Sequence, residues 1–348
     1  MSWPVLRAGL ELLLGGRPDG ECHLSLLGGE PLLQYPLIRR AIEYVARRGP
    51  RVRLVPSLVT NGTLLDARRL RFLLANNVRV TLSFDGLPAA QDHRARGTFL
   101  HLDRLLSLLR RQYSDHFHRR IGVTVVVHAA ALECLADSFE YLLRKQVREI
   151  RIAPAMGSWA WRITDIERLE RQFARIFDVS KRHYESTGRV PMALFRNPEL
   201  DLDRPIGEWC CGICSARSPV VDVDGRVYPC AMLIRSCQTV APPPMGRRLG
   251  RLSLGHIGEP GLADRAAKLP DIARELEIFA RQDRKWSSYG KCDDCPSVGV
   301  CVICPIASRK DRRVTDPLQV SDFQCAFNRV AFDYRRRFPC QPAPPDAV

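Results

Sequence analysis

The chain has 348 residues, 45% of them hydrophobic and 26% charged, and a net charge of +15. These proportions exclude disorder as the main state. The sequence contains no apolar run of about 18 residues, which a membrane-spanning helix needs, and Arg7 and Glu11 interrupt the first apolar stretch, where a secretory signal would lie. Basic residues are spread along the chain and aromatic residues make up only 7%, so the charge does not predict a nucleic-acid partner. We expect a cytoplasmic protein, with no membrane partner, that has one large α/β domain and a smaller one.

Short apolar segments alternate with amphipathic segments through the first 200 residues. The chain opens with a helical stretch, and the expected strands are then 22–27, 52–59, 78–84, 121–127 and 149–153. The expected helices that follow them are 37–48, 66–74, 100–111, 135–145 and 165–187. This alternation predicts parallel strands with right-handed crossovers. A βα barrel or half barrel should begin with a strand, so we expect one strand to be missing from the front.

Glycine-containing polar motifs follow four of the expected strands. They are Gly28-Gly29-Glu30-Pro31, Thr60-Asn61-Gly62, Ser83 to Gly86 and Pro154 to Gly157. Each motif alone is an ordinary turn signal, but in barrel enzymes the carboxyl ends of the strands form the active-site rim. On such a rim Glu30 can bind an ammonium group, and Arg94 or Arg96 can bind a carboxylate. These are the two charged ends of an amino acid.

The 13 cysteines are an odd number and lie mostly in the last 140 residues, which indicates metal or redox chemistry rather than disulfides. The segment 220–230 resembles a β-hairpin with an Asp-Gly turn, which would bring Cys214 and Cys230 together. Two four-thiolate sites can be formed from Cys214, Cys230, Cys292, Cys295, Cys301, Cys304, Cys325 and one of Cys210 or Cys211. Cys22, Cys134, Cys237 and Cys340 are expected to be buried or spare thiols. The spacing alone leaves zinc and iron–sulfur clusters open.

Taken together, these motifs resemble the radical S-adenosylmethionine (SAM) superfamily with a C-terminal SPASM domain. Gly28 to Leu32 resembles the family's motif for the SAM amino group, and Thr60 to Thr63 and Ser83 to Gly86 resemble its third and fourth strand ends. The SPASM pattern is matched by Cys214, Gly225 and Cys230, then by the run Cys292 to Cys304 and by Cys325. This match favours iron–sulfur clusters over zinc.

The resemblance implies a partial (βα)6 barrel that lacks its first strand, at 1–200, followed by a small cysteine-rich iron–sulfur domain at 201–335 and a disordered tail at 336–348. One auxiliary 4Fe-4S cluster would take Cys214, Cys230, Cys304 and either Cys210 or Cys211. The other would take Cys292, Cys295, Cys301 and Cys325. The residues that would bind SAM are Gly28, Gly29, Glu30, Pro31, Thr60, Asn61, Ser83, Asp85 and one of Arg94 or Arg96.

The implied activity is radical modification of a peptide or protein. In the family a reduced cluster, supplied by a low-potential electron donor, cleaves SAM to a 5′-deoxyadenosyl radical that abstracts a hydrogen from the substrate, and the auxiliary clusters bind substrate or accept an electron. Two alternatives remain: a non-catalytic iron–sulfur scaffold or binding protein that has lost the SAM-cleaving cluster, and, more weakly supported, a zinc-ribbon nucleic-acid binder.

The sequence departs from the family's pattern at four points. The CxxxCxxC loop is absent, so we expect a third cluster on a missing N-terminal segment and no activity from the chain as given. Cys301 and Cys304 are separated by two residues where the family usually has three. Gln91 takes the place of a usual His, and Ala231 takes the place of the Asp that acts as proton acceptor in sulfatase-maturating members. The last departure argues against sulfatase maturation.

Overall fold

The computed structural model describes residues 1–15, 20–47, 52–156, 160–196, 213, 218–234 and 243–339. The chain divides into two compact units. The sheet unit comprises Leu13–Ala155, Thr164–Glu199 and Val330–Val348, and the cysteine-rich unit comprises Met1–Leu12, Met156–Ile163 and Leu200–Arg329. Among the described residues, no helix has the length and apolar character needed to cross a membrane.

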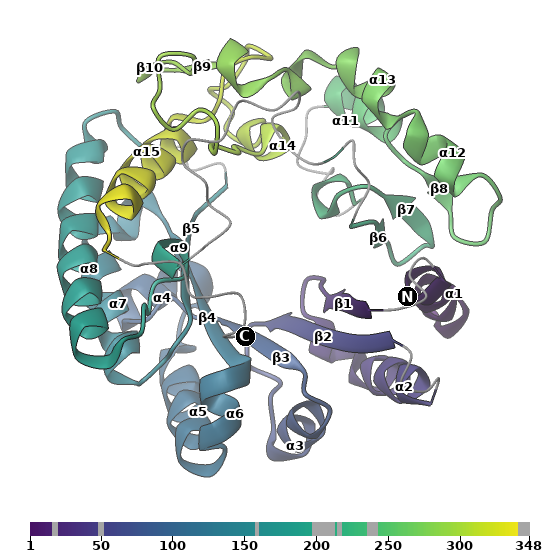
Figure 1. Ribbon diagram of the computed structural model, residues 1–348, viewed down its shortest axis with the longest axis horizontal. Coiled ribbons are helices and arrows are strands. Elements are labelled where there is room, and N and C mark those ends of the chain that lie inside the picture. Colours follow the sequence, from purple (N-terminus) through teal and green to yellow (C-terminus); the bar gives the residue numbers. More distant parts are fainter. Residues whose placement is uncertain are drawn as a thin grey trace. The chain divides into compact units, whose positions relative to one another are not determined.

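The sheet unit is built on five parallel strands in the order β1-β2-β3-β4-β5. The strands are β1 (Gly20–Leu26), β2 (Val52–Thr60), β3 (Arg79–Ser83), β4 (Ile121–Val127) and β5 (Ile150–Pro154). Figure 1 shows the sheet curling, with helices along its outer side. The unit is therefore the mixed α/β half barrel that the sequence predicted, with strands in sequential order as right-handed crossovers require.

Helices connect and cover these strands. They are α2 (Tyr35–Ala46), α3 (Ala67–Ala75), α4 (Pro88–Ala95), α5 (Phe99–Gln112), α6 (Ser114–Arg120), α7 (Leu135–Arg144), α8 (Asp165–Thr187) and α9 (Ala193–Arg196), with the short 3-10 helices η1 (Pro31–Gln34) and η2 (Ala129–Cys134). Helix α1 (Trp3–Gly15) precedes β1, and most of it belongs to the cysteine-rich unit. The core lies between helices and sheet, because alternate strand residues such as Val80, Leu82 and Phe84 are fully buried. Asp66 caps α3 as expected, accepting a hydrogen bond from the Arg69 amide at 2.7 Å.

All five expected strands and the helices expected after them are confirmed, with ends shifted by at most two residues. Three short helices of this unit, α4, α6 and α9, were not predicted. Helix α9 has only four residues, and α4 and α6 are strongly polar and lack the apolar repeat by which the longer helices were recognised. Helix α4 begins with Pro88 at its first turn, a position where the missing N–H costs nothing.

The cysteine-rich unit contains many short elements. They are β6 (Val220–Val221), β7 (Arg226–Tyr228), η4 (Ala231–Leu233), α11 (Pro243–Gly250), β8 (Gly255–His256), α12 (Leu262–Ala267), α13 (Leu269–Arg274), η5 (Glu277–Phe279), η6 (Gln282–Arg284), β9 (Trp286–Ser287), β10 (Gly290–Lys291), α14 (Pro305–Ser308) and the start of α15 (Asp322–Arg337). The predicted hairpin is confirmed as the antiparallel pair β6–β7, to which β8 adds a third strand. A hydrophobic cluster around Val227, Leu233 and Leu252 forms its main core.

The C-terminal helix α15 runs to Arg337, and Phe338 is 4% exposed, stacked on Phe195 with ring centroids 4.8 Å apart. The start of the tail that was expected to be disordered is therefore packed. Residues 340–348, which include Cys340, lie outside the described residues.

Candidate cofactor sites at the sheet edge and among the cysteines

The four strand-end motifs follow strands of one parallel sheet. Thr60 pairs with Leu82 across β2 and β3, Ser83 pairs with Thr124 across β3 and β4, and Val127 pairs with Pro154 across β4 and β5. Because the strands are parallel, their carboxyl ends share one edge of the sheet. The motif 154–157 is described as far as residue 156.

Glu30 joins the ends of β1 and β2. Its carboxylate accepts hydrogen bonds from the Leu32 amide at 3.1 Å, the Thr60 hydroxyl at 2.8 Å and the Asn61 amide at 2.9 Å. An ionised carboxylate has about four acceptor positions, so about one remains for an external donor. The protein thus orients this carboxylate before any ligand binds, and Gly28, Gly29 and Pro31 set the turn around it.

Asn61 organises the loop after β2. Its side-chain oxygen accepts from both the amide and the hydroxyl of Thr63, at 2.9 and 2.7 Å. The next residue, Gly62, has φ +77°, and a Cβ there would lie 2.7 Å from a methyl carbon of Leu102. Only glycine satisfies both the backbone angle and the close approach.

Asp85 is committed to the fold. Its carboxylate accepts from Arg94 through Nε at 2.9 Å and Nη2 at 2.8 Å, and from the Val126 amide at 2.7 Å, with a residue exposure of 1%. The pair ties helix α4 and strand β4 to the end of β3. Because two of the Arg94 donors are engaged by Asp85, the exposed Arg96 is the better candidate for a ligand carboxylate.

Gly86 and Gln91 fix the same loop. Gly86 has φ +91°, and a Cβ there would lie 2.6 Å from the Cβ of Ser138 in α7. The Gln91 side chain is buried; its oxygen accepts from the Asp85 amide at 2.9 Å and its nitrogen donates to Thr98 at 2.8 Å. Gln91, which stands where the family usually has His, therefore supports the loop that carries Asp85.

A pair of histidines at this edge was missed by the sequence analysis. His128 follows β4 directly, and its ring stacks on that of His93 with centroids 6.4 Å apart. Burial lowers the pKa of His128, with Arg94 and His93 acting in the same direction and Asp85 in the opposite one. Its place immediately after a strand is the same signal that identified the other motifs.

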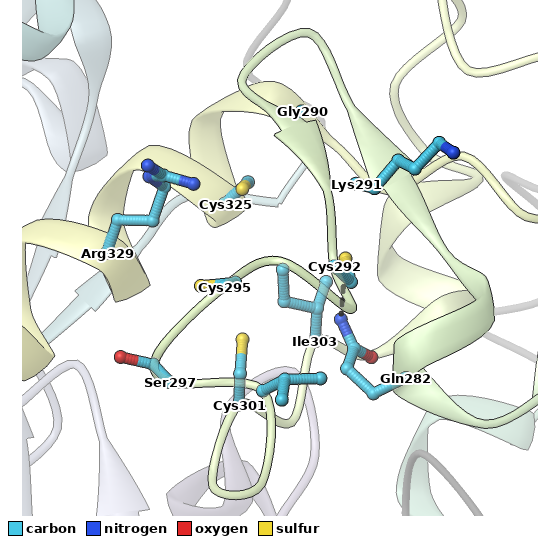
Figure 2. A pocket seen from close by; sticks show the side chains of 11 residues that line it. Gln282, Gly290, Lys291, Cys292, Cys295, Ser297, Cys301, Ile303, Cys325 and Arg329 are labelled. Carbon is cyan, nitrogen blue, oxygen red and sulfur yellow. Dashed lines mark hydrogen bonds between the residues drawn. The ribbon is translucent and has the colours of Figure 1, made fainter.

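Four cysteines line one cavity of the cysteine-rich unit. Cys292, Cys295, Cys301 and Cys325 surround it together with Gln282, Ser297, Ile303 and Arg329 (Figure 2). Cys325 comes from α15, and the other three come from the segment after β10. Cys304 is not among the lining residues. These four are the residues that the family resemblance assigned to a single cluster.

Cys292 and Cys325 are buried, and Cys295 and Cys301 are partly buried. Burial raises the pKa of Cys301 to about 12 and that of Cys292 to about 11, and the neighbouring Cys325 adds to both shifts. Burial also raises the pKa of Cys325. Thiolates become favourable at such a site when a cationic metal centre offsets their charge, so the donor set fits a metal centre.

The spread of the sulfur atoms bears on which metal fits. No group of three or more His, Cys, Asp or Glu side chains in the described part of the chain has the spacing of a single-ion site. A four-iron cluster places each thiolate on a different iron, so its sulfurs lie farther apart than around one zinc. The choice between one zinc ion and a cluster therefore rests on the family resemblance.

The second expected cysteine set is described only in part. Cys230 and Cys304 pack against the same hydrophobic cluster. Each sulfur accepts from a backbone amide at 3.4 Å, from Met232 and Ala307 respectively. Cys210, Cys211, Cys214 and the spare Cys237 lie outside the described residues. Cys22 is buried and Cys134 partly buried, and both thiols are free.

No family model matches the chain. It is 23% identical over 228 residues to the cysteine-type anaerobic sulfatase-maturating enzyme of Clostridium perfringens, with 61% of this chain and 60% of that protein covered. It is 28% identical over 156 residues to the serine-type enzyme of Klebsiella aerogenes, with 42% and 37% covered. The chain thus spans less than two thirds of the curated relatives that it matches.

The fold is similar to two groups of solved structures. Native anSMEcpe with bound AdoMet and Kp18Cys peptide matches with a TM-score of 0.70, 18% identity and coverage of 97% of this chain and 89% of that one. Streptococcus suis SuiB bound to its precursor peptide SuiA matches with a TM-score of 0.51, 14% identity and coverage of 87% and 65%. Together the comparisons support a protein of the radical SAM/SPASM type, as the motifs predicted.

Proposed function

We propose that this chain is part of a radical SAM/SPASM enzyme that modifies a peptide or protein. The observation that carries the proposal is the convergence of Cys292, Cys295, Cys301 and Cys325 on one buried cavity. Spacing alone left zinc and iron–sulfur open, and the resemblance to the SPASM pattern favours a cluster. The SAM core would cover 1–200 and the SPASM domain 201–335.

The cysteines would hold two auxiliary 4Fe-4S clusters. The first would bind to Cys292, Cys295, Cys301 and Cys325, and the second to Cys214, Cys230, Cys304 and one of Cys210 or Cys211. When bound with SAM, such cofactors supply one-electron chemistry that generates a 5′-deoxyadenosyl radical and abstracts a hydrogen from the substrate, with the protein supplying binding and orientation. A low-potential electron donor is the implied partner.

The residues at the sheet edge would bind SAM. Glu30, held by Thr60 and Asn61, would accept the SAM ammonium with its remaining acceptor position. Arg96 would bind the carboxylate, because Arg94 is occupied by Asp85. Ser83 and the backbone of Gly28 and Gly29 would complete the contacts, while Asp85 acts by positioning the loop.

The substrate proposal rests on the neighbours, two of which were solved with a peptide bound, Kp18Cys in one case and SuiA in the other. Ala231, which follows Cys230 at the start of η4, stands where sulfatase-maturating members carry an Asp. We therefore propose a peptide or protein substrate other than a sulfatase.

Metal analysis of anaerobically purified protein tests the proposal. We expect a brown protein with about eight iron atoms and as many sulfides per chain, four at each auxiliary site. A Cys301→Ser variant should lose about half of the iron, whereas Cys134→Ser, which changes a partly buried cysteine on the sheet unit, should lose none. Stoichiometric zinc without iron would contradict the proposal and favour the zinc-ribbon alternative.

A second candidate is a non-catalytic iron–sulfur scaffold. It is favoured by one observation, that the 348 residues contain no CxxxCxxC run. The DNA upstream of the Met1 codon distinguishes the two, because only the enzyme requires a CxxxCxxC loop before the first strand-end motif. An in-frame CxxxCxxC there supports the enzyme, and an upstream in-frame stop codon without one supports the scaffold.

A further inference from the structure

Three of the four thiols that line the cluster cavity accept a hydrogen bond from a neutral side chain. Gln282 Nε2 lies 3.5 Å from the Cys292 sulfur, Ser287 Oγ lies 3.1 Å from that of Cys325, and Asn328 Nδ2 lies 3.3 Å from that of Cys301. The donors come from three separate elements, η6, β9 and α15. The arrangement therefore does not follow from one local turn.

The Gln282 side chain is oriented with its N–H toward the Cys292 sulfur. The side chain is buried, with 4% of the residue exposed, and its carbonyl oxygen has no hydrogen-bond partner among the described residues. Burying an unpaired amide oxygen is unfavourable. At Gln282 the amide oxygen is nevertheless left unpaired, while the N–H of the same amide points at Cys292, as the dashed line in Figure 2 shows.

A buried ammonium lies behind the same cysteine. Lys285 is 2% exposed, and its Nζ donates to the Ile278 carbonyl at 2.8 Å. The Cys292 amide donates to the Lys285 carbonyl at 2.9 Å. No carboxylate lies within ion-pair distance of Lys285 in the described part of the chain. A buried cation requires compensating negative charge, which a cluster bound by four thiolates supplies.

We propose that Gln282, Ser287, Asn328 and Lys285 raise the reduction potential of the auxiliary cluster at Cys292, Cys295, Cys301 and Cys325. This inference rests on the proposed function. Reduction adds one electron and one negative charge to the cluster, and no bond to the protein forms or breaks. Hydrogen bonds to the sulfurs and a nearby positive charge stabilise the more negative state more strongly. The four residues are positioning residues.

An anaerobic redox titration with dithionite, followed by electron paramagnetic resonance, tests the proposal. Ser287→Ala and Lys285→Met should each lower the midpoint potential of this cluster. At the wild-type midpoint we expect the ratio of reduced to oxidised cluster to fall about tenfold, which corresponds to about 59 mV for a one-electron couple. Ser287→Thr keeps the hydroxyl and should restore the potential.

Two controls accompany the titration. Ser297→Ala removes the same hydroxyl from the same cavity, but no hydrogen bond from Ser297 to a sulfur is described, so its midpoint should match the wild type. The other auxiliary cluster is an internal reference, because no described hydrogen bond joins the four residues to Cys230 or Cys304.

The outcomes separate the two proposals. A wild-type protein without iron refutes the proposed function itself. Wild-type iron content with unchanged midpoints in both Ser287→Ala and Lys285→Met overturns the inference alone. If either of these variants loses iron, Gln282→Met takes its place. It keeps the side-chain length and removes the amide, whose oxygen has no partner among the described residues, and an unchanged midpoint there overturns the inference.

Discussion

The polar side chains at the sheet edge and those in the cysteine cavity are stabilised in different ways. At the sheet edge, the carboxylates are satisfied by hydrogen bonds from the protein itself: Glu30 accepts from Thr60 and Asn61, and Asp85 from Arg94 and Val126. In the cavity, buried thiols with raised pKa values face one another with neutral donors behind them. The first site is formed by the protein alone, whereas we propose that the second is completed by a metal centre. The comparison implies that the two units differ in their dependence on metal.

Removal of iron should therefore have the largest effect and should be confined to one unit. A structural metal site can contribute on the order of 10 kcal/mol to folding. We expect hydrogen-exchange protection to collapse between β9 and the start of α15 when the clusters are removed by chelation, while β2, β3 and β4 keep theirs. Equal loss of protection in both units would break the comparison.

The next largest effect should come from Asp85→Asn. It leaves the partly buried Arg94 guanidinium without its charged partner, and breaking such a pair costs about 3 kcal/mol. The measurement is the urea midpoint of the sheet unit. Asp92→Asn is the matched control, since Asp92 is exposed on α4, the helix that carries Arg94, and among the described residues accepts only from the Gly97 amide at 2.9 Å. Similar losses in both variants would show that Asp85 has no special structural role.

Gly86→Ala should destabilise the sheet unit by about 2 kcal/mol through a strained backbone and a clash with Ser138. Gly97→Ala isolates the backbone part, because Gly97 has a similar φ of +77° but nothing within 4 Å of a Cβ. Urea unfolding should show a clearly smaller loss for Gly97→Ala. Gly86→Ala combined with Ser138→Gly should recover only part of this difference, because the Cα of residue 138 would still lie 2.9 Å from the added Cβ.

The sequence predicted the strands and the shared strand-end edge, because parallel strands impose a repeating apolar pattern and a common direction. It also predicted which four cysteines converge, by resemblance to a family pattern. It left Arg94 and Arg96 open, because the choice depends on where the Asp85 carboxylate points after folding. Helix α4 and His128 were missed, since one lacks apolar periodicity and the other is a single residue after a strand. The donors to the sulfurs depend on contacts between distant segments, which spacing does not encode.

The smallest expected effect is a pH dependence of the free energy of unfolding that is specific to the sheet unit. Burial lowers the pKa of His128, next to His93, Arg94 and Asp85, so the folded state favours the neutral ring. The unfolded chain then takes up the proton first, and the free energy of unfolding falls as the pH drops below the unfolded His pKa of about 6.5. His128→Gln should flatten this slope in the sheet unit between about pH 6.5 and 5. His118 and His183, whose pKa values burial also lowers, leave a residual slope in the variant, so the difference between the two profiles is the quantity to measure. If the two profiles are identical, the preference for a neutral His128 ring does not contribute to the stability of the sheet unit.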